Sequence, residues 1–200
     1  MGCPLSAGYC LNRPDTGGWR EPARTVCPAC RVASLGAMGM VVELMRLSPD
    51  ELTSARAVAA LPPGVDEEEM LSDGTRRRLS IDKAWDGISF LLTGDGLLDV
   101  DDFHPLRNIY LPMERLVLDH EWSVLEPAGV VAVSAALASV SDDELRARFD
   151  PVRMSELDLY PNIWDDPSEL DEYLLPYIRE LREFYACAAR RGDAVISILG

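Results

Sequence analysis

The segment from Asp82 to Gly94, DKAWDGISFLLTG, constrains the fold more than any other stretch of this chain. Ala84, Ile88 and Leu91 recur at helical spacing and share one face. Trp85 and Leu92 lie next to that face. Gly94 stands where a helix commonly ends with a left-handed residue. A helix that is apolar around most of its circumference has to be covered on most sides. The sequence therefore predicts a central core helix with Trp85 as its main anchor.

The chain of 200 residues divides into two parts of different composition. Residues 1–36 are rich in Gly, Pro, Arg and Cys and lack an apolar period, so burial there would not offset the entropy of ordering. We expect a disordered extension, or a start codon assigned too far upstream, since Met38 or Met40 would serve as well. Residues 38–200 carry the regular patterns and suffice for one domain with its own core.

Local signals from residue 40 onward predict a helix-rich domain. Capping boxes at Ser48 and Ser141 open two helices. A long amphipathic helix begins near residue 170 and ends at Gly192, and Pro176 should kink or split it. The other expected elements are an apolar helix at 127–139 and strands at 40–47, 114–120 and 193–199. Together they predict a single domain of the α/β class, with a mixed β-sheet layered with helices.

The chain resembles the YfbM-like family of bacterial proteins in five stretches, which occur in this order: MGMVVELMRLSPDEL, DKAWDGISFLLTG, DDELRARFDP, YPNIWDD and GDAVISIL. The resemblance covers residues 38–200, and the helix around Trp85 is its most specific mark. It implies a single-domain α/β fold and no activity, because the family is known mainly as a domain of unknown function. The stretch Gly96–Trp122 matches the family pattern poorly, and Pro176 replaces a helix-compatible residue.

The net charge of the chain limits the classes of partner that it can bind. It has 34 acidic and 19 basic residues, a net charge of −15. Residues 1–36 hold four Arg against one Asp and one Glu, which is +2, so the remainder carries −17. Such a surface repels phosphate backbones, and we therefore expect no nucleic-acid partner. It suits a basic protein partner by complementary charge, or serves solubility alone.

The sequence shows no membrane segment and no signal peptide. Its longest apolar stretch, GVVAVSAALASV, has about a dozen residues against about 20 that span a bilayer. The N-terminus lacks an apolar region behind a basic one. Five cysteines, an odd number, suggest reduced thiols. We therefore expect a cytoplasmic protein.

Four cysteines near the N-terminus make the most metal-like pattern. Cys27 and Cys30 form a C-x2-C pair, with Cys3 and Cys10 upstream. Four thiolates can hold zinc tetrahedrally, although the upstream spacing is loose for a zinc knuckle. A redox role would need the pair at a helix N-terminus after a strand, and no strand pattern precedes it. We expect an unstructured tail, with zinc and redox chemistry as the alternatives.

Other chemical motifs are weak. His104 and His120 have acidic neighbours but form no i, i+4 ligand pair, and we expect exposed side chains. The acidic run DGLLDVDD lacks the glycine that a calcium-binding loop requires at its sixth position. Neither a glycine-rich phosphate loop nor a G-x-S-x-G motif occurs.

A softer candidate site comes from two of the most family-like stretches, and its residues are Trp85, Asp86, Tyr160, Trp164 and Asp165. Aromatic faces beside carboxylates suit a pocket for a cation or a sugar-like ligand. Equally, Trp164 could fasten its loop to the core, and Asp165 could cap the next turn.

The missing catalytic constellation favours a non-catalytic interaction protein, of an accessory or immunity type, that binds a basic partner. The alternative is an enzyme or small-ligand binder that uses the region of Trp85 and Trp164. A third hypothesis is a zinc-bearing adaptor that uses the N-terminal cysteines. The sequence does not decide whether the chain is an enzyme, and the missing constellation argues against it.

Overall fold

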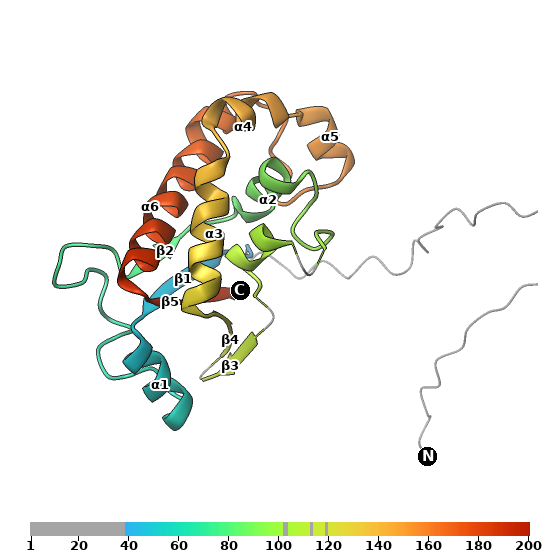
Figure 1. Ribbon diagram of the computed structural model, residues 1–200. Coiled ribbons are helices and arrows are strands. Elements are labelled where there is room, and N and C mark those ends of the chain that lie inside the picture. The colour runs from blue at the N-terminus through green and yellow to red at the C-terminus, as the bar shows by residue number, and fades with distance from the viewer. Residues whose placement is uncertain (1–38, 102–103, 113, 119) are drawn as a thin grey trace, which may run out of the picture. The chain divides into compact units, whose positions relative to one another are not determined.

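The computed structural model describes residues 39–101, 104–112, 114–118 and 120–200 (Figure 1). Gly39–Gly200 form one compact unit. The strands of the described residues are β1 (Val42–Leu47), β2 (Arg78–Ser80), β3 (Glu114–Val117), β4 (Glu121–Leu125) and β5 (Ala194–Leu199). The α-helices are α1 (Pro49–Val58), α2 (Trp85–Thr93), α3 (Pro127–Ser139), α4 (Asp142–Arg148), α5 (Pro151–Glu156) and α6 (Leu175–Arg191). The four N-terminal cysteines and the predicted extension at 1–36 lie outside the described residues.

The strands form a sheet in the order β2-β1-β5-β4-β3. β1 and β5 pair over their whole length, from Val42 opposite Leu199 to Leu47 opposite Ala194. The expected α/β class, a sheet layered with helices, is confirmed. The sheet itself is antiparallel rather than mixed, because each of the four strand pairs runs antiparallel.

Strand alternation divides the core between the two faces of the sheet. Val42 and Leu44 of β1 pack in the larger cluster with α2, α3 and α6. Met45 and Leu47 point to the other face and pack with α1. Figure 1 shows α3 and α6 lying together across the sheet, with α1 at its lower end. Because side chains alternate along a strand, Arg46 belongs to the same face as Val42 and Leu44.

The central helix is confirmed as α2. Every residue from Trp85 to Leu92 is buried. Gly94 has a φ of 91° and its N–H donates to the carbonyl oxygen of Phe90 at 2.8 Å, which ends the helix as expected. Ala84 provides no side-chain cap at the other end, so tertiary burial rather than capping fixes this helix.

Other local signals also act as predicted. Ser48 and Ser141 both complete capping boxes. The long C-terminal helix changes type near Pro176 without a break, because a π-helical turn at Leu170–Leu174 runs directly into α6. Pro176 lies in the first turn of α6, where its missing N–H costs least. Gly192 ends α6 with a φ of 71°.

Three short elements were not expected. β2 has only three residues, α5 has six, and β4 begins at Glu121, just after the strand predicted at 114–120, of which β3 occupies Glu114–Val117. Elements this short form because a neighbouring strand or helix receives them, so their own sequence marks them weakly. Among the described residues, no helix is both long and apolar enough to cross a membrane.

Candidate functional site

Three of the five predicted site residues contact one another. The rings of Trp85 and Tyr160 are stacked, with centroids 5.4 Å apart and an interplanar angle of 20°. The indole N–H of Trp85 donates to the carbonyl oxygen of Met40 at 3.0 Å. Trp85 is buried and Tyr160 half-buried, so Tyr160 covers the Trp85 ring from outside.

Asp86 joins two loops through its carboxylate. Oδ1 accepts from the backbone N–H of Leu97 at 2.7 Å, and Oδ2 accepts from that of Tyr160 at 2.9 Å. Only 8% of Asp86 is exposed. Burial raises the pKa of the Asp86 carboxyl, while the two backbone hydrogen bonds act in the opposite direction. With both oxygens engaged, Asp86 positions these loops rather than facing a ligand.

Trp164 lies wholly inside the core, with 0% of its surface exposed. Its indole N–H donates to the carbonyl oxygen of Leu159 at 2.8 Å. Gly87 makes this position accessible to the ring, because a Cβ there would lie 2.5 Å from Trp164 Cη2. Asp165 is exposed and accepts from the Ser155 hydroxyl at 3.3 Å. Of the five predicted site residues, therefore, only Tyr160 and Asp165 can contact a ligand without rearrangement of the core.

The histidines are separate from each other. His104 caps the short 3-10 helix Pro105–Ile109, since its Nδ1 accepts from the backbone N–H of Leu106 at 3.2 Å. His120 lies in the turn between β3 and β4. Within the described ranges, no three His, Cys, Asp or Glu side chains gather in a way that would hold a metal ion.

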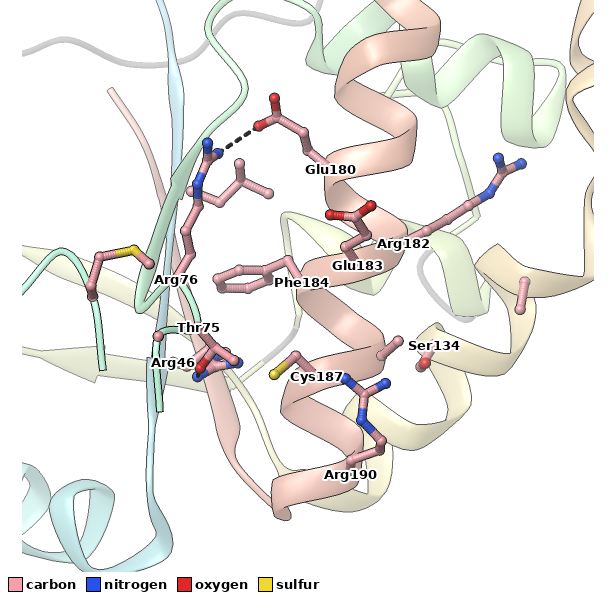
Figure 2. Close-up of a pocket in the computed structure, with 15 residues that line it drawn as sticks. Arg46, Thr75, Arg76, Ser134, Glu180, Arg182, Glu183, Phe184, Cys187 and Arg190 are labelled. Atoms are coloured by element: carbon pink, nitrogen blue, oxygen red, sulfur yellow. Dashed lines mark hydrogen bonds and ion pairs between the residues drawn. The ribbon is translucent and has the colours of Figure 1, made fainter. Parts of the chain in front are cut away.

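A groove of about 800 Å³ lies on the α6 side of the sheet, between α6, α3 and the segment Met70–Leu79 (Figure 2). We call it the arginine groove, because its charged lining consists of Arg46, Arg76, Arg182, Arg190, Glu180 and Glu183. Apolar lining comes from Met70, Leu79, Ala138 and Phe184. The volume is that of a typical small-molecule site.

Arg46 lies at the base of this groove and is only 1% exposed. Its Nη2 donates to Thr75 Oγ1 at 2.9 Å, and the guanidinium carbon lies 5.9 Å from the centroid of the Phe184 ring. Its Nε is 3.6 Å from Asp193 Oδ2, which is too long for a hydrogen bond. Nε and Nη1 both lack an acceptor within the described part of the chain.

The carboxylate nearest to Arg46, that of Asp193, also lies close to a second arginine. Asp193 also lies 3.4 Å from Arg191 Nε. Burial raises the pKa of the Asp193 carboxyl, and the guanidinium of Arg46, followed by that of Arg191, opposes this shift. Asp193 thus lies beside two arginines, of which Arg46 is buried, and the exposed Arg191 also pairs with Asp73.

The outer wall of the groove is the turn that precedes β2, and hydrogen bonds fix its position. Asp73 accepts from the backbone N–H and the hydroxyl of Thr75, at 3.0 and 2.6 Å. Three contacts then tie the turn to the rest of the domain: Arg46 to Thr75, Arg191 to Asp73, and Arg76 to Glu180. The groove is therefore preformed.

The remaining arginines differ in their pairing. Arg182 is held by Asp142 and by the carbonyl oxygens of Leu137 and Val140, and Figure 2 shows it directed away from the others. Arg76 pairs with Glu180 at 2.8 Å. Arg190 is exposed and has neither a hydrogen bond nor an ion pair with the described residues.

Residues 38–198 match the model of a family described as a domain of unknown function, DUF1877. The chain belongs to this family. The expected resemblance to YfbM-like proteins is confirmed, since Protein YfbM of Escherichia coli strain K12 is 29% identical over 129 residues, which are 62% of this chain and 77% of that protein. The crystal structure of YfbM from Escherichia coli, a protein of unknown function, matches with a TM-score of 0.61 and 21% identity, over 80% of this chain and 100% of that one.

For this DUF1877 protein, reasoning from sequence missed the arginine groove. The one available signal is Arg46, a charged residue inside the strand MVVELMRL on the face that Val42 and Leu44 give to the core. A buried charge in an apolar strand requires partners. Spacing alone did not indicate Arg76 or Arg190, because they come from distant segments.

Proposed function

We propose that this DUF1877 protein is a non-catalytic binding protein whose acidic loops engage a basic partner protein. The segment Met154–Ile178 contains no Lys or Arg. Its acidic residues, most of them exposed, are Glu156, Asp158, Asp165, Asp166, Glu169, Asp171 and Glu172. Such a surface attracts a basic protein and steers its approach.

The observation that carries this proposal is the pairing of two acidic loops by Asp86. Its carboxylate binds Leu97 in one loop and Tyr160 in the other, and exposed Asp95 and Asp99 thereby lie near the second acidic segment. Each loop also exposes a large apolar side chain, Leu98 at 72% and Ile163 at 39%. Apolar anchors surrounded by charge are typical of protein interfaces.

The other hypotheses have less support. A ligand at Trp85 and Trp164 would meet little exposed ring surface, because both are buried. A zinc-bearing adaptor would depend on cysteines outside the described residues. A cytoplasmic location remains part of the proposal on the cysteine content alone.

Affinity capture with matched charge variants tests the proposal. The loop variant combines Asp95→Asn, Asp99→Asn and Glu172→Gln. The control combines Asp66→Asn, Glu67→Gln and Glu69→Gln, exposed residues of the loop before β2, which Figure 1 shows on another side of the molecule. Both variants remove three negative charges.

We expect wild type and control to recover the same near-stoichiometric basic partner from host lysate at low salt, and to lose it at high salt. The loop variant should recover little of it. Equal recovery by both variants would contradict the assignment to these loops.

A further inference from the structure

We propose that the arginine groove binds a small organic anion, whose carboxylate or phosphate oxygens lie against Arg46 and Arg190 and whose apolar part lies against Met70 at the rim, beside the wall formed by Phe184 and Leu79. This site is separate from the acidic loops, because none of its lining residues belongs to them.

The first argument is the unsatisfied charge of Arg46. Burying a guanidinium is costly unless its donors and its charge are both satisfied. Two of its three nitrogens lack an acceptor among the described residues, and the carboxylate of Asp193 lies 3.6 Å away, beyond hydrogen-bond distance. Asp193 compensates part of the charge from 3.6 Å but accepts no hydrogen bond, and water would accept a hydrogen bond without adding negative charge. An oxyanion supplies both.

The second argument is the local sign of the charge. Four arginines and two glutamates line the groove, a net charge of +2 within a domain that carries −17. Arg182 is fully occupied by Asp142 and backbone carbonyls, and Arg76 is paired with Glu180. Arg190 has no partner in the described part of the chain, so its donors are available to a ligand. Guanidinium groups are the preferred partners of carboxylates and phosphates.

The third argument is the shape and lining of the site. About 800 Å³ exceeds the volume of an inorganic ion by far. Met70, which is 49% exposed at the rim, offers the larger apolar surface, and the edges of Phe184 and Leu79, 5% and 3% exposed, complete the wall. A ligand that carries one oxyanion and an apolar body therefore fits the groove better than a free ion does.

Calorimetric titration of the full-length protein tests this inference, in a buffer free of phosphate and sulfate. The probes are phenyl phosphate, benzoate, inorganic phosphate and the neutral benzyl alcohol. We expect phenyl phosphate or benzoate to bind, and the stronger of the two identifies the oxyanion. No heat from either anion at millimolar concentration, or equal binding of benzyl alcohol, overturns the proposal. Inorganic phosphate that binds as tightly as phenyl phosphate overturns the apolar part of it.

Variants locate the site. Arg190→Gln should raise the Kd about tenfold, since it removes a charge-assisted hydrogen bond. Its melting temperature should stay within about 2 °C of wild type, because Arg190 is exposed and pairs with none of the described residues. Arg153→Gln, which changes another exposed arginine on α5, is the matched control and should leave the Kd unchanged. Equal weakening by both variants would show a general charge effect and refute the site.

Cys187 provides a second readout that needs no substitution of the buried Arg46. Its half-buried thiol lines the groove, and Figure 2 shows it between Arg46 and Arg190. A bound anion should slow alkylation of Cys187 by iodoacetamide at least several-fold, measured on its peptide by mass spectrometry. An unchanged rate with saturating probe would place the probe elsewhere and refute the groove as its site.

Discussion

The Trp85 group and the arginine groove make opposite use of polar atoms. In the Trp85 group, the indole N–H groups of Trp85 and Trp164 both donate to backbone carbonyls, and both oxygens of Asp86 accept from backbone N–H groups. In the groove, two nitrogens of the buried Arg46 have no acceptor, and Arg190 has no partner among the described residues.

This difference separates structural from ligand-directed polar groups. Residue composition made the Trp85 group look like a binding site, because aromatic rings and carboxylates often line pockets. The contacts assign these side chains to loop fastening instead. A buried polar group with satisfied partners stabilises its own fold, whereas an unsatisfied one has capacity left for a ligand.

The largest expected loss of stability comes from Trp164→Ala. The substitution removes a fully buried indole and leaves a cavity, which should cost about 3–5 kcal/mol. For a domain of this size, that corresponds to a fall in melting temperature of roughly 10 °C or more in thermal unfolding. The control is Ile163→Ala, which changes the exposed neighbour and should have little effect. Equal shifts for the two variants would restore Trp164 as a possible pocket wall.

Gly87→Ala should have the next largest effect. A Cβ at this position would lie 2.5 Å from Cη2 and 2.9 Å from Cζ2 of Trp164, so the variant should lose about 1–3 kcal/mol in denaturant unfolding. Without that contact, alanine inside a helix would instead stabilise by about 1 kcal/mol.

A double-mutant cycle with Trp164→Phe isolates this contact. Phenylalanine lacks the two clashing atoms, so Gly87→Ala should cost clearly less in that background. The same cost in both backgrounds would mean that the Trp164 ring does not explain the glycine.

The smallest expected loss of stability comes from removing the ion pair between Asp142 and Arg182, the groove arginine that is already paired. Hydrogen bonds from Arg182, and next from Arg179, lower the pKa of Asp142 below its usual value. The folded state therefore binds this proton less tightly than the unfolded state does. The stabilisation is complete above the usual carboxyl pKa and is lost as the pH falls through the lowered one.

Asp142→Asn should therefore lower the free energy of unfolding by about 1 kcal/mol at pH 7, with a difference that shrinks below about pH 4. Asp143→Asn is the control, because the Asp143 side chain is 95% exposed and makes only a local i, i+3 pair. Denaturant unfolding across this pH range measures both. A deficit of Asp142→Asn that stays constant with pH would contradict the paired state of Arg182.

Several elements could be predicted because their signals are local. Ser48 and Ser141 bond with residues three positions ahead, and Gly94 and Gly192 end helices through bonds to the preceding turn. β4 was not predicted, since it forms through its pairing with β3 and β5.

The candidate site was predicted only in part. Trp85, Asp86 and Tyr160 do lie together, which their membership of two family-like stretches had suggested. The burial of Trp85 was predicted from its apolar helix, whereas that of Trp164 was left open, because an aromatic residue suits a core and a pocket equally well. Gly87 was the missed signal, since a glycine inside an apolar helix indicates close approach of another side chain.

The sequence by itself determined the capped helices, the central apolar helix and the acidic character of the domain, because these follow from composition and from bonds within one or two turns. Only the tertiary structure decided which charges are satisfied. The turn before β2 reaches Arg46 across 29 positions and Arg191 across 118. Such distant residues meet when the sheet and α6 pack, so the burial of Arg46 and the freedom of Arg190 depend on packing that local sequence patterns do not specify.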